Sequence, residues 1–176
     1  MTEVVYYVAA SLDGYIAGAD GGVDWLSAVE RPGEDYGYAT FFAAVDALIM
    51  GSATYEQVLG FGAWPYGDKP CWVLTQRPLE AASPGVIITP QSPAEIVAEM
   101  EERQVKRAWL VGGSAVAASF RAQGLVSEYV VSVIPTILGE GIPLFAIGGP
   151  QEALTLIECR SFESGLVQLT YESAAD

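Results

Sequence analysis

Histidine is absent from the 176-residue sequence, and positively charged residues are few. Without histidine, the chain lacks the commonest metal ligand and the commonest general base, and it cannot build a triad that depends on an imidazole. Only eight lysines and arginines accompany 22 aspartates and glutamates, which gives a net charge of −14. Such an excess of negative charge repels nucleic acid and anionic membranes, so we expect neither as a partner.

Cysteine is also scarce. Cys71 and Cys159 stand far apart, without the paired spacing of a zinc or redox motif, so we expect no metal site. Both lie in apolar runs, which predicts two buried thiols in a reducing compartment. The sequence shows no basic and apolar signal-peptide pattern, and no apolar run could span a bilayer. We therefore expect a cytoplasmic protein.

Apolar residues are abundant, at 51% of the chain, whereas only 17% of the residues are charged. A chain of this length and composition predicts one domain over residues 1–176 with a sizeable core. The excess of apolar residues also favours a partner surface, and a homodimer is its simplest form.

Short apolar runs alternate with helical patterns along most of the chain. We expect strands over residues 4–10, 47–50, 71–74, 86–88 and 107–111, and helices over 34–44, 52–59, 92–103 and 114–123. Strand patterns then dominate, over residues 129–134, 154–162 and 166–171, the last two as an antiparallel pair. This order predicts a three-layer α/β/α sandwich with a mostly parallel mixed sheet and antiparallel C-terminal strands.

A glycine pair, Gly112–Gly113, joins the strand pattern of 107–111 to the helix pattern that begins at Ser114. Ser114 is a natural N-cap, and two residues without Cβ atoms let another molecule approach the backbone amides at the positive end of the helix dipole. The turn could bind phosphate or pyrophosphate, or it could be a tight turn that binds nothing. No GxGxxG motif follows any strand, which excludes an ordinary Rossmann nucleotide site.

Five short motifs follow one another along the chain. They are Ala9-Ala-Ser-Leu-Asp-Gly-Tyr-Ile-Ala17, Asp24-Trp25, Leu48-Ile-Met-Gly-Ser-Ala-Thr-Tyr-Glu56, Val73-Leu-Thr-Gln-Arg77 and Leu110-Val-Gly-Gly-Ser114. Their order resembles the dihydrofolate reductase-like superfamily, and within it the branch similar to the reductase domain of bacterial riboflavin biosynthesis. The resemblance covers nearly the whole chain. It implies the fold of that superfamily, a homodimer, NADPH as hydride donor, and a small C=N or C=O substrate that is pterin-like or 5-amino-6-(5-phosphoribosylamino)uracil-like.

The resemblance also implies cofactor-binding residues. Gly112, Gly113, Ser114 and Ala115 match the pyrophosphate turn, Gly51 and Thr54 match a second cofactor turn, and Thr75 and Arg77 match the loop at the adenosine side. Arg77 is either a partner for a 2′-phosphate or a solvated loop charge. The family usually has a basic residue after the glycine that corresponds to Gly51, whereas this chain has Ser52, so NADH stays a candidate beside NADPH.

Three residues are candidates for the substrate side. Asp35 lies where folate reductases carry their single acid, and aromatic neighbours could raise its pKa so that it helps deliver a proton, although acids are also ordinary first-turn residues. Asp13 is a substrate or nicotinamide contact, or it makes an Asx turn. Trp25 covers the site or fills the core. The sequence thus predicts a reductase, with a non-catalytic nucleotide- or metabolite-binding protein of the same fold as the alternative, and flavin use as a third possibility.

Overall fold

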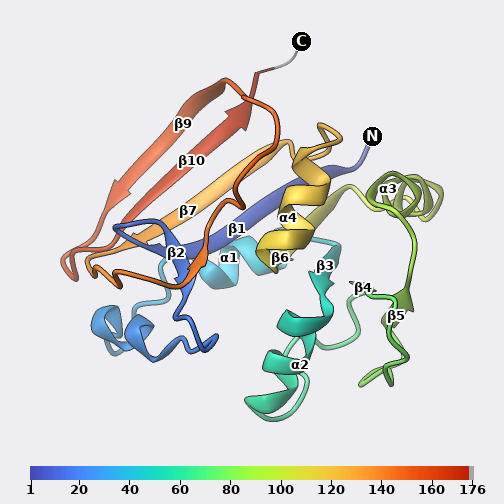
Figure 1. The fold of residues 1–176 in the computed structure, drawn as a ribbon, viewed down its shortest axis with the longest axis horizontal. Helices are drawn as coiled ribbons and strands as arrows, with labels where there is room; N and C mark the ends of the chain where they lie inside the picture. Colours follow the sequence, from blue (N-terminus) through green and yellow to red (C-terminus); the bar gives the residue numbers. More distant parts are fainter. Residues whose placement is uncertain (175–176) are drawn as a thin grey trace.

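The protein is described here by a computed structural model of residues 1–174, in which eight strands form one mixed sheet (Figure 1). The strand order is β5-β4-β3-β6-β1-β7-β10-β9. The strands are β1 (Glu3–Ser11), β3 (Ala47–Gly51), β4 (Cys71–Leu74), β5 (Val86–Thr89), β6 (Arg107–Gly112), β7 (Glu128–Ile134), β9 (Leu154–Ser161) and β10 (Val167–Ser173).

Parallel pairing runs from β5 to β7, and the last two strands are antiparallel. The strand β1 lies between β6 and β7, so two segments distant in sequence flank it. Every residue of β3 is buried, as expected for a parallel strand covered on both faces. The sequence prediction of a mostly parallel sheet with antiparallel C-terminal strands is confirmed.

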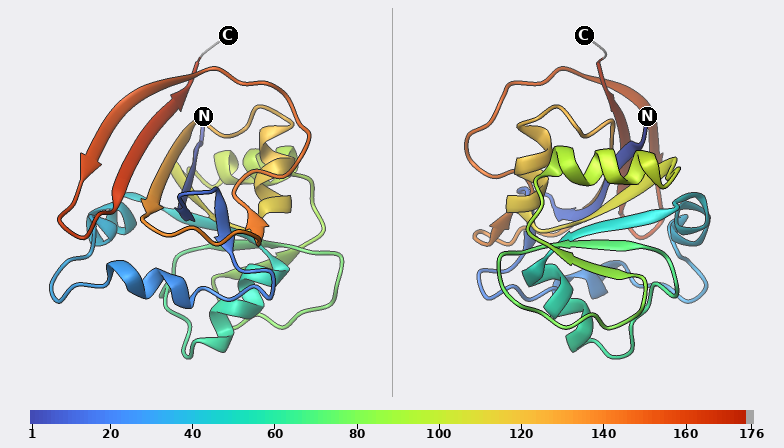
Figure 2. Two further views of the ribbon diagram at one scale, coloured as in Figure 1. Left: turned by 60° about the vertical axis from the view of Figure 1, so that its left-hand side comes forward. Right: turned by 90° about the vertical axis from the view of Figure 1, so that its right-hand side faces the viewer.

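Helices cover both faces of the sheet. On one face lie α3 (Pro93–Glu102) and α4 (Ser114–Arg121), which contribute Ile96 and Phe120 to a core cluster with Tyr6 of β1. On the other face lie α1 (Tyr38–Ala44) and α2 (Ser52–Gly60), with Tyr55 of α2 in a second cluster beside Met50. Figure 2 shows α3 and α4 on one side of the sheet and α2 on the other. The three-layer arrangement is therefore confirmed.

The helix expected over residues 34–44 is shorter than predicted. Tyr36 and Gly37 have φ values of 56° and 83°, a left-handed conformation that a right-handed helix cannot include. The helix α1 starts only at Tyr38, after Asp35 has accepted hydrogen bonds from the amides of Gly37 (2.9 Å) and Ala39 (3.0 Å). Asp35 therefore lies before the helix, and its carboxylate accepts one amide of the first turn.

The strand β9 is the outer edge of the sheet, and all eight of its residues are exposed. Leu156 and Ile157 are 52% and 51% exposed. The prediction that Cys159 is buried is wrong, because an apolar run identifies a strand but not whether another layer covers it. Cys71, on β4, is buried as predicted.

Two short strands form a separate small sheet, β2 (Tyr15–Ala17) and β8 (Ile142–Pro143). They bring the loop that follows β1 against the loop that follows β7. The first of these loops continues into a 3₁₀ helix, η1 (Asp24–Val29), which the sequence pattern did not predict. No helix within residues 1–174 has the length and apolar character that crossing a membrane requires.

Candidate functional site

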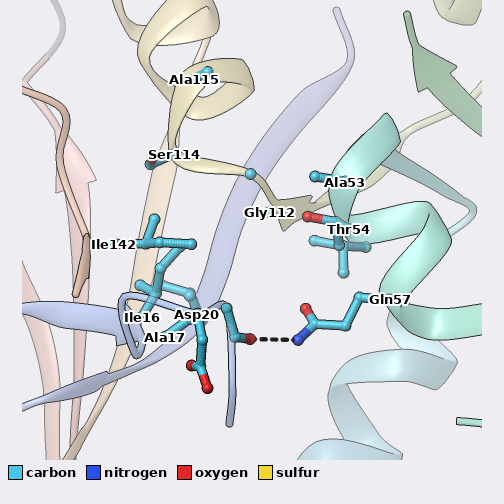
Figure 3. Close-up of a pocket in the computed structure, with 14 residues that line it drawn as sticks. Ile16, Ala17, Asp20, Ala53, Thr54, Gln57, Gly112, Ser114, Ala115 and Ile142 are labelled. Carbon is cyan, nitrogen blue, oxygen red and sulfur yellow. Dashed lines mark hydrogen bonds between the residues drawn. The ribbon is translucent and has the colours of Figure 1, made fainter. Parts of the chain in front are cut away.

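A cavity of about 560 Å³ lies at the carboxyl ends of the central parallel strands (Figure 3). Ligands of α/β sheets bind at this edge, and the volume lies in the usual range of small-molecule sites. The lining residues come from β1, β2, β6 and β8, the loop after β2, the first two turns of α2, and the start of α4. They are Val8, Ile16, Ala17, Asp20, Gly21, Ala53, Thr54, Gln57, Val111, Gly112, Gly113, Ser114, Ala115 and Ile142.

Two helices begin at this cavity. Ala53 and Thr54 belong to the first turn of α2, and Ser114 and Ala115 to the first turn of α4. Neither helix start has a side-chain cap. The first amides of a helix have no partner within it, and they carry the positive end of the helix dipole. Two such ends at one cavity form a site suited to an anionic group.

The third long helix, α3, starts differently. Ser92 and Glu95 form a complete capping box, in which the Ser92 amide donates to the Glu95 carboxylate (2.8 Å) and the Glu95 amide donates to Ser92 Oγ (3.4 Å). None of the residues of this box lines the cavity. The chain thus caps α3 with its own side chains and leaves α2 and α4 without such caps.

The turn before α4 depends on its two glycines. Gly112 and Gly113 have φ values of 153° and 91°, in the range that residues with a Cβ atom rarely adopt. Gly113 is itself the N-cap, with no side chain to donate or accept, and Ser114 is the first helical residue. The prediction of a Ser114 N-cap is therefore wrong, although the glycine turn and its place at a cavity are as the sequence indicated.

Gly51 allows the two helices to approach each other. A Cβ atom on Gly51 would lie 2.9 Å from Cγ2 of Val116 on α4, which is closer than real contacts allow. A Cβ atom on Gly113 would lie 3.5 Å from Oγ1 of Thr54. Gly51 does not line the cavity, but its missing side chain lets the start of α2 lie beside the start of α4.

The rest of the cavity wall is apolar apart from one loop and Gln57 of α2. Val8, Ile16 and Ile142 form its apolar part, and Asp20 is its one charged side chain. The loop that carries Asp20 is fastened to α2 by a hydrogen bond of 2.7 Å from Gln57 Nε2 to the Gly21 carbonyl (Figure 3). Gln57 and Asp20 were not predicted from the sequence. A signal existed for Gln57, which lies four residues after Ala53 on the same helix face.

Asp13 does not line the cavity but holds a neighbouring loop. Its carboxylate accepts hydrogen bonds from Ser11 Oγ (2.7 Å), the Leu138 amide (3.1 Å) and the Gly139 amide (2.8 Å). The bond from Ser11, followed by those from the two amides, lowers the pKa of Asp13. The carboxylate thereby ties the end of β1 to the loop that leads into β8, and Ile142 of β8 lines the cavity.

Asp35 and Trp25 do not reach the cavity. Asp35 is exposed, and the amide hydrogen bonds from Ala39 and Gly37 lower its pKa. This contradicts the expectation of a raised pKa, because the aromatic neighbours leave the carboxylate in solvent and two amides stabilise its charge. Trp25 packs against a small core cluster with Val29 and Ile134, so its position agrees with the core-filling alternative.

Thr75 and Arg77 do not line the cavity. They follow β4, whose last residue, Leu74, pairs with Gly51 of β3. Thr75 Oγ1 accepts a hydrogen bond from the Arg77 amide (3.0 Å). The Arg77 guanidinium makes two bonds to the Glu56 carboxylate on α2, of 2.7 and 3.1 Å. The predicted adenosine-side loop is therefore next to α2, with its arginine in an ion pair.

The model of the RibD C-terminal domain matches residues 2–168. The chain belongs to the RibD C-terminal domain family. It is 35% identical over 173 residues to YwjB of Bacillus subtilis strain 168, with 98% of each chain covered. Membership of this family confirms the resemblance stated above.

Solved structures of the family share the fold. A protein of Shewanella sp. PV-4, assigned provisionally to riboflavin biosynthesis, is 30% identical with a TM-score of 0.90, covering 99% of this chain and 100% of that one. A Thermotoga maritima deaminase and 5-amino-6-(5-phosphoribosylamino)uracil reductase has a TM-score of 0.73 at 16% identity, covering 98% of this chain and 57% of that one. The second likeness shows the fold alone, which is dihydrofolate reductase-like.

Proposed function

We propose that residues 1–176 act as one domain, a reductase that uses a reduced nicotinamide dinucleotide. The observation that carries this proposal is the pair of helix starts, α2 and α4, that open on one cavity without side-chain caps. A pyrophosphate suits that donor set, because backbone amides and helix dipoles bind it without a nearby cation. The family supports a nucleotide cofactor. NADPH is the coenzyme that the resemblance implies, and NADH is the other candidate.

The donor groups fit such a cofactor. The amides at Gly113, Ser114 and Ala115 and the hydroxyl of Thr54 would hold the pyrophosphate, and Val8, Ile16 and Ile142 would exclude water beside the nicotinamide. When bound, the dinucleotide supplies the hydride. The role of the chain is to bind and orient the donor and to keep the reaction away from solvent.

The substrate we propose is a small C=N or C=O compound, pterin-like or 5-amino-6-(5-phosphoribosylamino)uracil-like. Membership of the RibD C-terminal domain family supports this class. Purified protein should oxidise NADH or NADPH in the presence of a substrate from a panel of such compounds. Binding of a coenzyme without turnover on any member of the panel would instead favour the alternative.

That alternative is a non-catalytic nucleotide- or metabolite-binding protein with the same fold. One observation favours it: Asp35, the acid expected to deliver a proton, is exposed, lies outside the cavity and has a lowered pKa. Tryptophan fluorescence, followed during titration with each coenzyme, measures binding separately from catalysis. Failure of both coenzymes to bind would refute the reductase proposal.

We further propose a homodimer that covers the edge strand β9. The eight exposed residues of β9, with Leu156 and Ile157 about half exposed, support this surface. Leu156→Lys should lower the mass measured by light scattering from two chains to one. Phe61→Lys, at an exposed residue after α2, is the matched control and should leave the mass unchanged.

A further inference from the structure

The distribution of positive charge around the cavity distinguishes the two candidate coenzymes. NADPH differs from NADH by a phosphate on the adenosine ribose, which adds negative charge that a nearby arginine can bind. None of the eight lysines and arginines of the chain lines the cavity. They are Arg31, Lys69, Arg77, Arg103, Lys106, Arg107, Arg121 and Arg160.

Within residues 1–174, Arg77 is the one cation in a segment that directly follows a parallel strand. Ligands bind at that end of the sheet, so Arg77 is the cation best placed for a 2′-phosphate. Lys106 and Arg107, by contrast, lie at the start of β6, at the opposite edge of the sheet. A 2′-phosphate would therefore depend on Arg77.

Arg77 already has an anionic partner. Its guanidinium contacts both carboxylate oxygens of Glu56, through Nη2 at 2.7 Å and Nη1 at 3.1 Å. This geometry lowers the pKa of Glu56 and raises the pKa of Arg77. Glu56 comes from α2, the helix whose first turn contributes Ala53 and Thr54 to the cavity wall.

The ion pair presents no net charge to a ligand. If a 2′-phosphate drew Arg77 away, the Glu56 carboxylate would be left beside it, and like charges at short range repel. The excess of negative charge on the whole chain and the Asp20 carboxylate in the cavity wall also repel a 2′-phosphate. A ribose with free hydroxyls is different, because its hydroxyl groups can donate to a carboxylate.

We propose that Glu56 is a specificity-determining residue that selects NADH over NADPH, by neutralising Arg77 and offering an acceptor to the ribose hydroxyls. This inference rests on the proposed binding of a nicotinamide dinucleotide at the cavity. Glu56 should then set the ratio of the affinities for NADH and NADPH, whereas a residue with a purely structural role would not change that ratio.

The test is calorimetric titration of the purified protein with NADH and with NADPH. The wild type should bind NADH about tenfold more tightly than NADPH at low salt, the effect of one charge-assisted contact. The ratio should fall as salt rises, because screening weakens the repulsion of the 2′-phosphate. Equal affinity or preference for NADPH overturns the inference and leaves the reductase proposal intact, whereas failure of both coenzymes to bind overturns both.

Variants then test Glu56 itself. Glu56→Gln should tighten NADPH binding by about tenfold, since Arg77 becomes an uncompensated cation. Arg77→Gln should weaken NADPH binding further and change NADH binding little. This variant tests the same ion pair if Glu56→Gln folds poorly. Glu99→Gln is the matched control, because Glu99 of α3 makes an ion pair with Arg103 (2.6 Å) and does not line the cavity. An unchanged coenzyme ratio in folded Glu56→Gln overturns the assignment.

Discussion

Gly113→Ala tests the glycine turn that carries the proposed function. The φ of Gly113 is 91°, and an alanine there is strained by about 1–3 kcal/mol. The new Cβ atom would lie 3.5 Å from Thr54 Oγ1 and 3.8 Å from Gly51 Cα, so no steric overlap adds to that strain. For a chain of this length the strain lowers Tm by roughly 2–12 °C.

The same substitution acts on ligand binding. The Cβ atom would stand between the starts of α2 and α4, where the pyrophosphate is proposed to lie. Loss of one well-aligned contact to a charged group weakens binding by about tenfold. The assay is the Kd for NADH or NADPH from quenching of tryptophan fluorescence, together with Tm from a thermal melt.

Gly124→Ala supplies the control. Gly124 follows the other end of α4, has a φ of 64°, and has no atom within 4 Å of an added Cβ. It shares the positive φ of Gly113 but lies at the far end of the helix. Gly124→Ala should lower Tm and leave Kd unchanged. If Gly113→Ala also lowered Tm without changing Kd, the pyrophosphate would not lie on this turn.

Three further predictions follow from other parts of the structure. Asp13→Asn places an amide donor against the Gly139 amide, so the loop after β7 should exchange its amide hydrogens faster; unchanged exchange would contradict the role of Asp13 in holding that loop. In the monomeric Leu156→Lys variant, where β9 is uncovered, Cys159 should react with a thiol reagent and Cys71 only after unfolding, because burial raises the pKa of Cys71 to about 12; two fast-reacting thiols would disprove this. Burial also raises the pKa values of Tyr6 and Tyr66, so the neutral groups stabilise the folded state fully below pH 9. Stability should then fall as the pH rises toward 12, as measured by urea midpoints, and a flat profile would count against it.

Much of the fold could be predicted because its signals are local. A few consecutive residues determine each of three features: the buried strand β3, the glycine turn before α4, and the capping box at Ser92. Their order along the chain was enough to predict three layers, and ligands of such sheets bind at the carboxyl ends of the strands. Thr54 and the glycine turn lie at that edge, and their contact with a cofactor stays a prediction.

The parts that could not be predicted depend on contacts between distant segments. Asp13 and Gly139 are 126 residues apart, and Gln57 and Gly21 are 36 apart, so no local pattern identifies either pair. The exposure of Cys159 follows from the position of β9 at the sheet edge, which is a property of the topology. Sequence spacing indicates which residues form a strand, but not what covers it.

The contrast between α3 and the helices α2 and α4 has a consequence for dynamics. A helix whose first amides lack internal partners frays from that end, and its opening costs less free energy than global unfolding. The first turns of α2 and α4 should therefore be the most labile part of the helical layers, while the capped start of α3 stays protected. An anionic ligand would accept hydrogen bonds from the first amides of both helices. Its binding would therefore order the first turns of α2 and α4 together.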